Sequence, residues 1–198
     1  MENCDPRFEP LLEKFDTDAF ELCDSTTYGL WPDFTLAYLN RAWFKFAAAN
    51  GAEHEIRKRW GLGTNALLAM DEPLRGYYKT ALTGCLEDGK PWGQDYVCPS
   101  ATIQRKFYMR AYPLQHDRGL LVVHSRVLER THNSPTAPAI EEFYTNDQGF
   151  IVQCMHCRLV QRCDHNDQWD MVPTWVAQRP ENTTGGLCPP CFAHYFGK

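Results

Sequence analysis

The sequence contains no long apolar run. None of its segments approaches the roughly 18 consecutive apolar residues of a membrane-spanning helix, so no spanning segment is predicted. The first ten residues, MENCDPRFEP, carry acidic residues and proline where a secretory signal has basic residues followed by an apolar stretch. We therefore expect a cytoplasmic protein that has no membrane partner.

Excess positive charge and nucleotide-binding motifs are also missing. The net charge of -5 and the pI of about 5.8 give the whole chain no electrostatic attraction to nucleic acid or to an anionic membrane. The sequence lacks the strings GxxxxGK[ST], GxGxxG and HExxH. Since no nucleophile and base stand at a recognised spacing either, we expect a protein that is not an enzyme.

Cysteine, in contrast, is abundant. The chain of 198 residues has nine cysteines, and five of them lie in the last 45 residues: Cys154, Cys157, Cys163, Cys188 and Cys191. Thiols stay reduced in the cytoplasm. Paired CxxC spacing in that compartment indicates metal binding or redox chemistry rather than a framework of structural disulfides.

Apolar periodicity in the first two thirds of the chain predicts a mixed α+β fold. Hydrophobic residues make up 43% of the sequence, which is enough for a genuine core. We expect a strand at 34–40, with Asn40 as the N-cap of a helix that Asn50 and Gly51 end. The other expected elements are a helix over 72–89 and strands at 92–98, 103–114 and 119–128.

Three strings carry a resemblance to a known domain family: YGLWPDFTLAYLNRAWFKFAAANG, GKPWGQDYVCPSATIQRKFYMRAYPL and GLLVVHSRV. With their order of strands and helices they resemble a PAS domain. The resemblance implies a PAS-like antiparallel sheet with flanking helices, which senses a signal or binds a protein, often around a small-molecule pocket and often as a dimer. It spans residues 20–130, after an N-terminal extension at 1–19.

Within the expected sheet, Phe107 and Met109 share the inward face of the strand at 103–114 with Ile103 and Ala111. Together with His124 they are candidates for lining a pocket, although such residues more often form plain core. A haem-binding PAS domain would need an axial ligand, and the histidines of this part are His54, His116, His124 and His132. Satisfied or surface histidines are the preferred interpretation, and noncovalent haem is the alternative.

The C-terminal part has a different composition. A polar stretch, ERTHNSPTAPAIEE, predicts a linker at 131–148 and a cysteine-rich module at 149–198. The module holds the two CxxC units CMHC and CPPC, which together supply the four soft ligands that structural zinc prefers. The predicted zinc ligands are Cys154, Cys157, Cys188 and Cys191. As second choices we consider His156, Cys163 and His165.

The strings CMHCRLVQ, WDMVPTWVAQ and GGLCPPCFAHYF are similar to a cysteine-rich tail that follows PAS or receiver domains in bacterial signalling proteins. The resemblance carries the four cysteines over to this chain. It does not carry over a histidine, because Thr184-Gly185-Gly186 stands where that pattern has Ser-His-Gly.

The leading hypothesis is a non-enzymatic signalling protein in which a PAS-like sensor domain is coupled to a zinc-stapled module. It predicts a protein partner or a homodimer, with a small-molecule ligand as a further option. One alternative is a thiol-disulfide redox protein whose CPPC cycles. Another is a zinc-dependent transcription regulator, but basic and acidic residues balance from Phe150 to Lys198, so nucleic acid is not the expected partner.

Overall fold

The computed structural model describes residues 3–49, 56, 58–132, 135–165 and 167–197, which form two compact units. The first unit comprises Met1–Met70, Tyr78–Gln94 and Tyr108–Ser125. The second comprises Asp71–Tyr77, Asp95–Phe107 and Arg126–Lys198. Each unit is therefore assembled from stretches that lie far apart in the sequence, and segments of the central strands belong to both.

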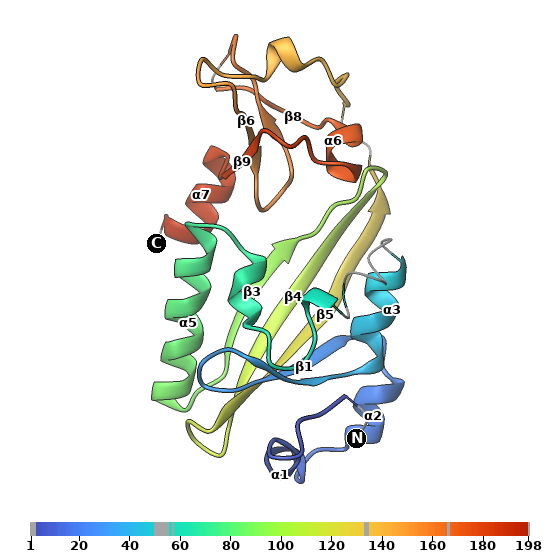
Figure 1. Ribbon diagram of the computed structural model, residues 1–198, viewed down its shortest axis with the longest axis vertical. Coiled ribbons are helices and arrows are strands. Elements are labelled where there is room, and N and C mark those ends of the chain that lie inside the picture. Colours follow the sequence, from blue (N-terminus) through green and yellow to red (C-terminus); the bar gives the residue numbers. More distant parts are fainter. Residues whose placement is uncertain (1–2, 50–55, 57, 133–134, 166, 198) are drawn as a thin grey trace. The chain divides into compact units, whose positions relative to one another are not determined.

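A five-stranded sheet with the order β2-β1-β5-β4-β3 runs through the first unit (Figure 1). β1 pairs antiparallel with both β2 and β5. The strands are β1 (Thr26–Leu30), β2 (Leu36–Leu39), β3 (Trp92–Val97), β4 (Ile103–Leu114) and β5 (Gly119–Thr131). With α3 (Arg41–Ala49) and α5 (Leu74–Asp88) beside the sheet, the fold class is the predicted one, a PAS-like antiparallel sheet with flanking helices.

The first predicted strand is shorter than expected. Phe34 has a φ of 66°, and its N–H donates to the carbonyl of Trp31 in a turn, so the strand begins only at Leu36. All four residues of β2 are buried, whereas a strand with one covered face would alternate between buried and exposed residues. The reason is a second layer of apolar side chains, because Phe8 and Leu11 pack in the same cluster as Ala37 and Tyr38.

Asn40 caps the following helix, as predicted. Its Oδ1 accepts the N–H of Trp43 at 3.2 Å and the N–H of Thr27 in β1 at 3.0 Å. Its Nδ2 donates to the carbonyls of Phe20 and Ser25 at 2.8 and 2.9 Å. This fully buried side chain therefore starts α3 and ties it to the first strand. The predicted stop at Asn50 and Gly51 lies outside the described residues.

The longer helix and the three closing strands also agree with the prediction. Gly89, at a φ of 61°, follows the last residue of α5, as expected for a residue just past a helix end. In β4, Phe107, Met109 and Ala111 are buried while Tyr108 and Arg110 are exposed. At 15 residues α5 is the longest described helix, and none of the described helices has the length and apolar character needed to cross a membrane.

Two short helices precede the sheet, and both begin in the stretch that was expected to be an extension. They are α1 (Glu9–Leu12) and α2 (Thr17–Leu22). Phe8, Leu11 and Leu12 are buried in the core cluster of the first unit, with Phe8 edge-on to Trp31 at a ring distance of 5.0 Å. The N-terminal stretch thus packs in the same apolar cluster as β2.

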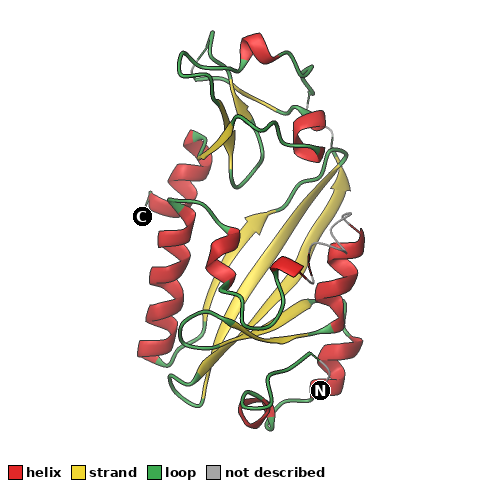
Figure 2. Ribbon diagram, viewed as in Figure 1, coloured by secondary structure: helices red, strands yellow, loops and turns green. Residues whose placement is uncertain are grey.

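The second unit contains a small sheet with the order β8-β7-β6-β9 (Figure 2). Its strands are β6 (Ile151–Cys154), β7 (Val160–Gln161), β8 (Trp169–Asp170) and β9 (Thr183–Gly186). β6, β7 and β8 are antiparallel neighbours, whereas β6 and β9 are parallel. The helix α6 (Pro173–Ala177) lies between β8 and β9, and α7 (Pro189–Phe196) follows β9.

Candidate metal centre

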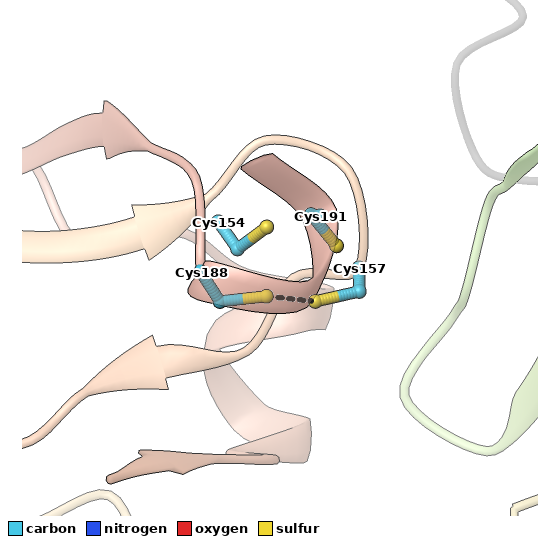
Figure 3. A group of neighbouring side chains, drawn as sticks. All are labelled: Cys154, Cys157, Cys188 and Cys191. Atoms are coloured by element: carbon cyan, nitrogen blue, oxygen red, sulfur yellow. Dashed lines mark hydrogen bonds between the residues drawn. The ribbon is translucent and has the colours of Figure 1, made fainter. Parts of the chain in front are cut away.

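Four cysteine side chains converge at one point of the second unit (Figure 3). The Sγ atoms of Cys154, Cys157, Cys188 and Cys191 all lie within 4.8 Å of one another. The Sγ atoms of Cys157 and Cys188 are 3.6 Å apart. Thiolates bound to zinc at about 2.3 Å stand about 3.8 Å from one another in a tetrahedron, whereas a disulfide needs about 2.05 Å. The spacing fits a shared ion and not a disulfide.

The first cysteine pair lies on a turn after a strand. Cys154 is the last residue of β6, and its N–H donates to the carbonyl of Leu159 at 2.7 Å. The N–H of Arg158 donates to the carbonyl of Cys154 at 2.9 Å, and Arg158 has a φ of 64°. This tight turn carries the chain from β6 toward β7 and places Cys157 beside Cys154.

The second pair lies on the first turn of α7. Cys188 is the N-cap residue, in extended conformation, and Pro189 and Pro190 occupy the first helical positions. Proline suits these positions because the backbone N–H that it lacks would have no partner inside the helix. The N–H of Phe192 donates to the carbonyl of Cys188 at 2.8 Å, so Cys191 sits one turn into the helix. The two prolines thus start the helix that sets the second pair of thiols.

Parallel pairing of β6 with β9 brings the two pairs together. In this register Cys154 lies opposite Gly186, two residues before Cys188. A Cβ at Gly186 would stand 2.8 Å from Cγ1 of Val152, and one at Gly185 would stand 2.8 Å from Sδ of Met155. The Gly-Gly step therefore allows β9 to approach the first pair closely.

Burial and mutual contact set the electrostatics of the cluster. Cys154, Cys188 and Cys191 are buried and Cys157 is partly exposed. Hydrogen bonds from Cys157, Cys188 and Cys191 lower the pKa of Cys154, and the bond to Cys154 raises the pKa of Cys157. Several thiolates at this spacing repel one another, so the cluster can lose all its protons only when a cation compensates the charge.

The second-choice residues lie outside this cluster. The buried His156 turns its ring toward β3, where its Nε2 accepts the N–H of Val97 at 2.8 Å. Burial lowers the pKa of His156 to about 4. Burial raises the pKa of the Cys163 thiol, whose backbone N–H is bonded to Phe143, and His165 is exposed. The four cysteines are thus the donor set that the structure gathers, and it consists of sulfur alone.

The residues predicted to line a pocket lie in two different environments, on β4 and beside Tyr28. Phe107 and Met109 are buried on one face of β4, and Phe107 stacks on Tyr96 at a ring distance of 5.4 Å. Nε2 of His124 lies 3.1 Å from the hydroxyl of Tyr28, and the two rings stack at 5.3 Å. Burial lowers the pKa of His124 to about 4. That these residues line a ligand pocket stays a prediction.

Two of the other histidines considered for haem can be located. His116 lies in the turn between β4 and β5 with a φ of 70°, and Nε2 of His132 is 3.1 Å from the carbonyl of Ser100. His54 lies outside the described residues. The hydrogen-bonded rings of His124 and His132 agree with the interpretation of satisfied histidines. The pairing of His124 with Tyr28 could not be read from the sequence, because the two residues are 96 positions apart.

No protein family matches the sequence, and no curated protein is significantly similar to it. Among solved structures, the PAS domain of BvgS from Bordetella pertussis has 14% identity and a TM-score of 0.41, covering 57% of this chain and 84% of that one. A domain of an HTR-like protein from Haloarcula marismortui has 15% identity and a TM-score of 0.39, covering 54% and 100%. The PAS domain of nitrogen regulation protein NR(II) from Vibrio parahaemolyticus has 12% identity and a TM-score of 0.36, covering 58% and 99%. The fold class rests on the strand order and helices described above.

Proposed function

We propose that this protein is a non-enzymatic cytoplasmic signalling protein, in which a PAS-like sensor domain is coupled to a structural zinc centre. The observation that carries the metal part is the convergence of Cys154, Cys157, Cys188 and Cys191 within 4.8 Å. The antiparallel sheet with flanking helices and the resemblance of the sequence to PAS domains support the sensor part. A protein partner or a second copy of the chain would receive the signal.

The donor set supports zinc as the ion. Four thiolates are soft ligands, and in a tetrahedral arrangement they are typical of structural zinc. The turn after β6 and the first turn of α7 each supply one pair, so the ion would join two elements whose cysteine pairs are thirty residues apart in sequence. Such an ion would contribute the stability that a module of this size cannot obtain from its apolar core alone.

The same donor set supports a role other than catalysis. A catalytic zinc keeps one position for water or substrate, while four cysteine ligands fill all four positions. An ion held in this way stabilises the fold around it and does not activate a nucleophile. We therefore place the response of the protein in its contact with a protein partner or a second copy of the chain, and not in a reaction at the metal.

The redox alternative requires contact only between the two cysteines of CPPC. A cycling CPPC would join Cys188 to Cys191, with Cys188 at the start of a helix. The structure also brings Sγ of Cys157 to 3.6 Å from Sγ of Cys188, across the two CxxC units. Contact between the units is what a shared tetrahedral ion requires, and this favours zinc over a dithiol that works alone.

Native mass spectrometry with metal analysis tests the proposal on full-length protein purified without added zinc. We expect one zinc per chain, and loss of the metal in Cys188→Ser. The matched control is Cys163→Ser, because Cys163 lies in the same unit but outside the cluster. A metal-free protein in which Cys188 and Cys191 form a reversible disulfide would contradict the proposal and favour the redox alternative.

A further inference from the structure

Two histidines of the second unit contact the same edge of a strand. β3 is the last strand in the order of the five-stranded sheet, so one of its sides has no neighbouring strand of that sheet. The N–H of Cys98, just beyond β3, donates to the carbonyl of Arg105 and thus points to the β4 side. Because backbone groups alternate in direction along a strand, Asp95 and Val97 direct theirs to the outer side. Both residues belong to the second unit.

Each outer backbone group meets an imidazole. The N–H of Val97 donates to Nε2 of His156 at 2.8 Å. Nε2 of His194 lies 3.1 Å from the carbonyl oxygen of Asp95 and, since a carbonyl only accepts, must donate to it. One ring therefore accepts and the other donates, which is the pattern that a neighbouring strand would offer. The two side chains cover this part of the edge in place of a strand.

Both histidines are tied to the candidate metal centre through the chain. His156 directly precedes Cys157, and His194 lies three residues after Cys191 on α7. The ring of Tyr195 packs edge-on to both, at 5.1 Å from His156 and 5.0 Å from His194. The two imidazoles are themselves 5.4 Å apart. The three rings thus form one packed group, which contacts β3 on one side and joins the cysteines on the other.

We propose that His156 and His194 are positioning residues that make the outer edge of β3 respond to the metal. The inference rests on the proposed zinc site and extends it to a regulatory contact. When Cys157 and Cys191 are held by one ion, the turn after β6 and the start of α7 are fixed, and the two rings stay on Asp95 and Val97. When the ion leaves, the two cysteine pairs separate and the edge of β3 loses its cover.

Amide hydrogen exchange in the full-length protein tests this directly, with the zinc-loaded and the chelated forms compared residue by residue. Loss of a hydrogen bond corresponds to about a fivefold change in protection, so we expect chelation to speed exchange at Val97 by about that factor or more. The amide of Cys98, which is bonded to Arg105 within the sheet, should keep its protection. It serves as the internal reference against unfolding of the whole unit.

Single substitutions distinguish the roles of the two histidines from a general loss of folding. His156→Ala should raise exchange at Val97 in the zinc-loaded protein without loss of zinc, and chelation should then add little. His194→Phe keeps a ring beside Tyr195 but cannot donate to Asp95, so we expect a smaller rise. The control His165→Ala removes an exposed histidine of the same unit and should leave exchange at Val97 unchanged. If His156→Ala does not fold, His156→Gln keeps an acceptor and should retain most of the protection at Val97.

The outcomes distinguish this inference from the proposed function. A protein that binds zinc, but whose exchange at Val97 does not change on chelation, overturns the inference and leaves the zinc centre in place. An equal rise at Val97 and Cys98 shows unfolding of the unit and also overturns it. A protein that binds no zinc overturns both.

Discussion

The two units obtain their stability in different ways. In the first, apolar side chains from α1, β2, β4 and β5 form one cluster, in which Phe8, Ala37 and Tyr38 are completely buried. In the second, the apolar cluster has five buried members: Tyr144, Ile151, Val160, Val172 and Trp175. Beside it stands a second cluster, made of cysteines. One chain thus combines a unit that its own core can hold together with a unit that an ion would have to complete.

Removal of the metal should produce the largest difference between the two units. Structural zinc contributes about 10 kcal/mol or more to the folding of small zinc modules, so a chelator should unfold the sheet of β6 to β9 and leave β1, β2 and β5 folded. Residue-resolved NMR spectra with and without chelator would show it as loss of dispersion for residues 149–197 only. An equal loss of dispersion in both units would contradict the view that only the second unit depends on a metal for its stability.

Truncation of a side chain in the apolar core of the first unit should instead destabilise that unit and leave the metal centre intact. Phe8→Ala removes a completely buried ring, and we expect it to lower the free energy of unfolding of the first unit by about 3–5 kcal/mol. Urea unfolding followed at Trp31, which packs against Phe8, measures the loss. Zinc content should be unchanged. The control is Phe15→Ala, since Phe15 is 38% exposed and its replacement should cost far less.

Asn40 tests how much of the first unit depends on one polar side chain. Asn40→Ala removes the cap of α3 and leaves four backbone groups, in buried or partly buried hydrogen bonds, without this partner, so we expect the free energy of unfolding to fall by about 2–4 kcal/mol. Asn40→Asp keeps the acceptor for Trp43 and Thr27 but loses the donor. Its free energy of unfolding should therefore lie between those of the wild type and Asn40→Ala. The midpoints of thermal unfolding rank the wild type and the two variants. If Asn40→Ala unfolds at the same temperature as the wild type, water replaces these hydrogen bonds and the prediction is wrong.

Acid should weaken the first unit through His124. Burial lowers its pKa from 6.5 to about 4 in the folded protein, so the unfolded chain binds the proton more tightly. The free energy of unfolding should therefore fall as the pH drops from about 6.5 to about 4, by about 2 kcal/mol, and this contribution should be constant above pH 7. His124→Gln can still bond to Tyr28 but does not titrate. Urea unfolding of both proteins at pH 7 and pH 4.5 gives the difference, and parallel pH profiles would contradict the prediction.

Much of the sheet was predictable because its strands follow simple rules. β4 alternates buried and exposed residues at Phe107, Tyr108 and Met109, and Asn40 stands where a strand gives way to a helix. The N-terminal helices were missed for a physical reason. α1 has four residues, too few for a helical period to appear, and its role becomes visible only when Phe8 packs on Tyr38 and Ala37.

The cysteine cluster was predictable to a similar degree. CxxC spacing identifies four thiols that can share an ion, and the structure brings these four together. The parallel pairing of β6 with β9 was not foreseen, since strands of four residues carry little pattern. The contact of His156 with Val97 lies beyond any local rule, because 59 residues separate the partners and the bond uses a backbone group.

The parallel register of Cys154 and Gly186 has a consequence for the order in which the molecule is made. The ribosome adds Cys188 and Cys191 after every strand of both sheets has been synthesised. No nascent chain can present all four thiols to an ion before Cys191 has been added. Metal binding by all four cysteines would therefore begin only after the strands of both sheets have been synthesised, and it could not assist strand pairing that takes place before that point.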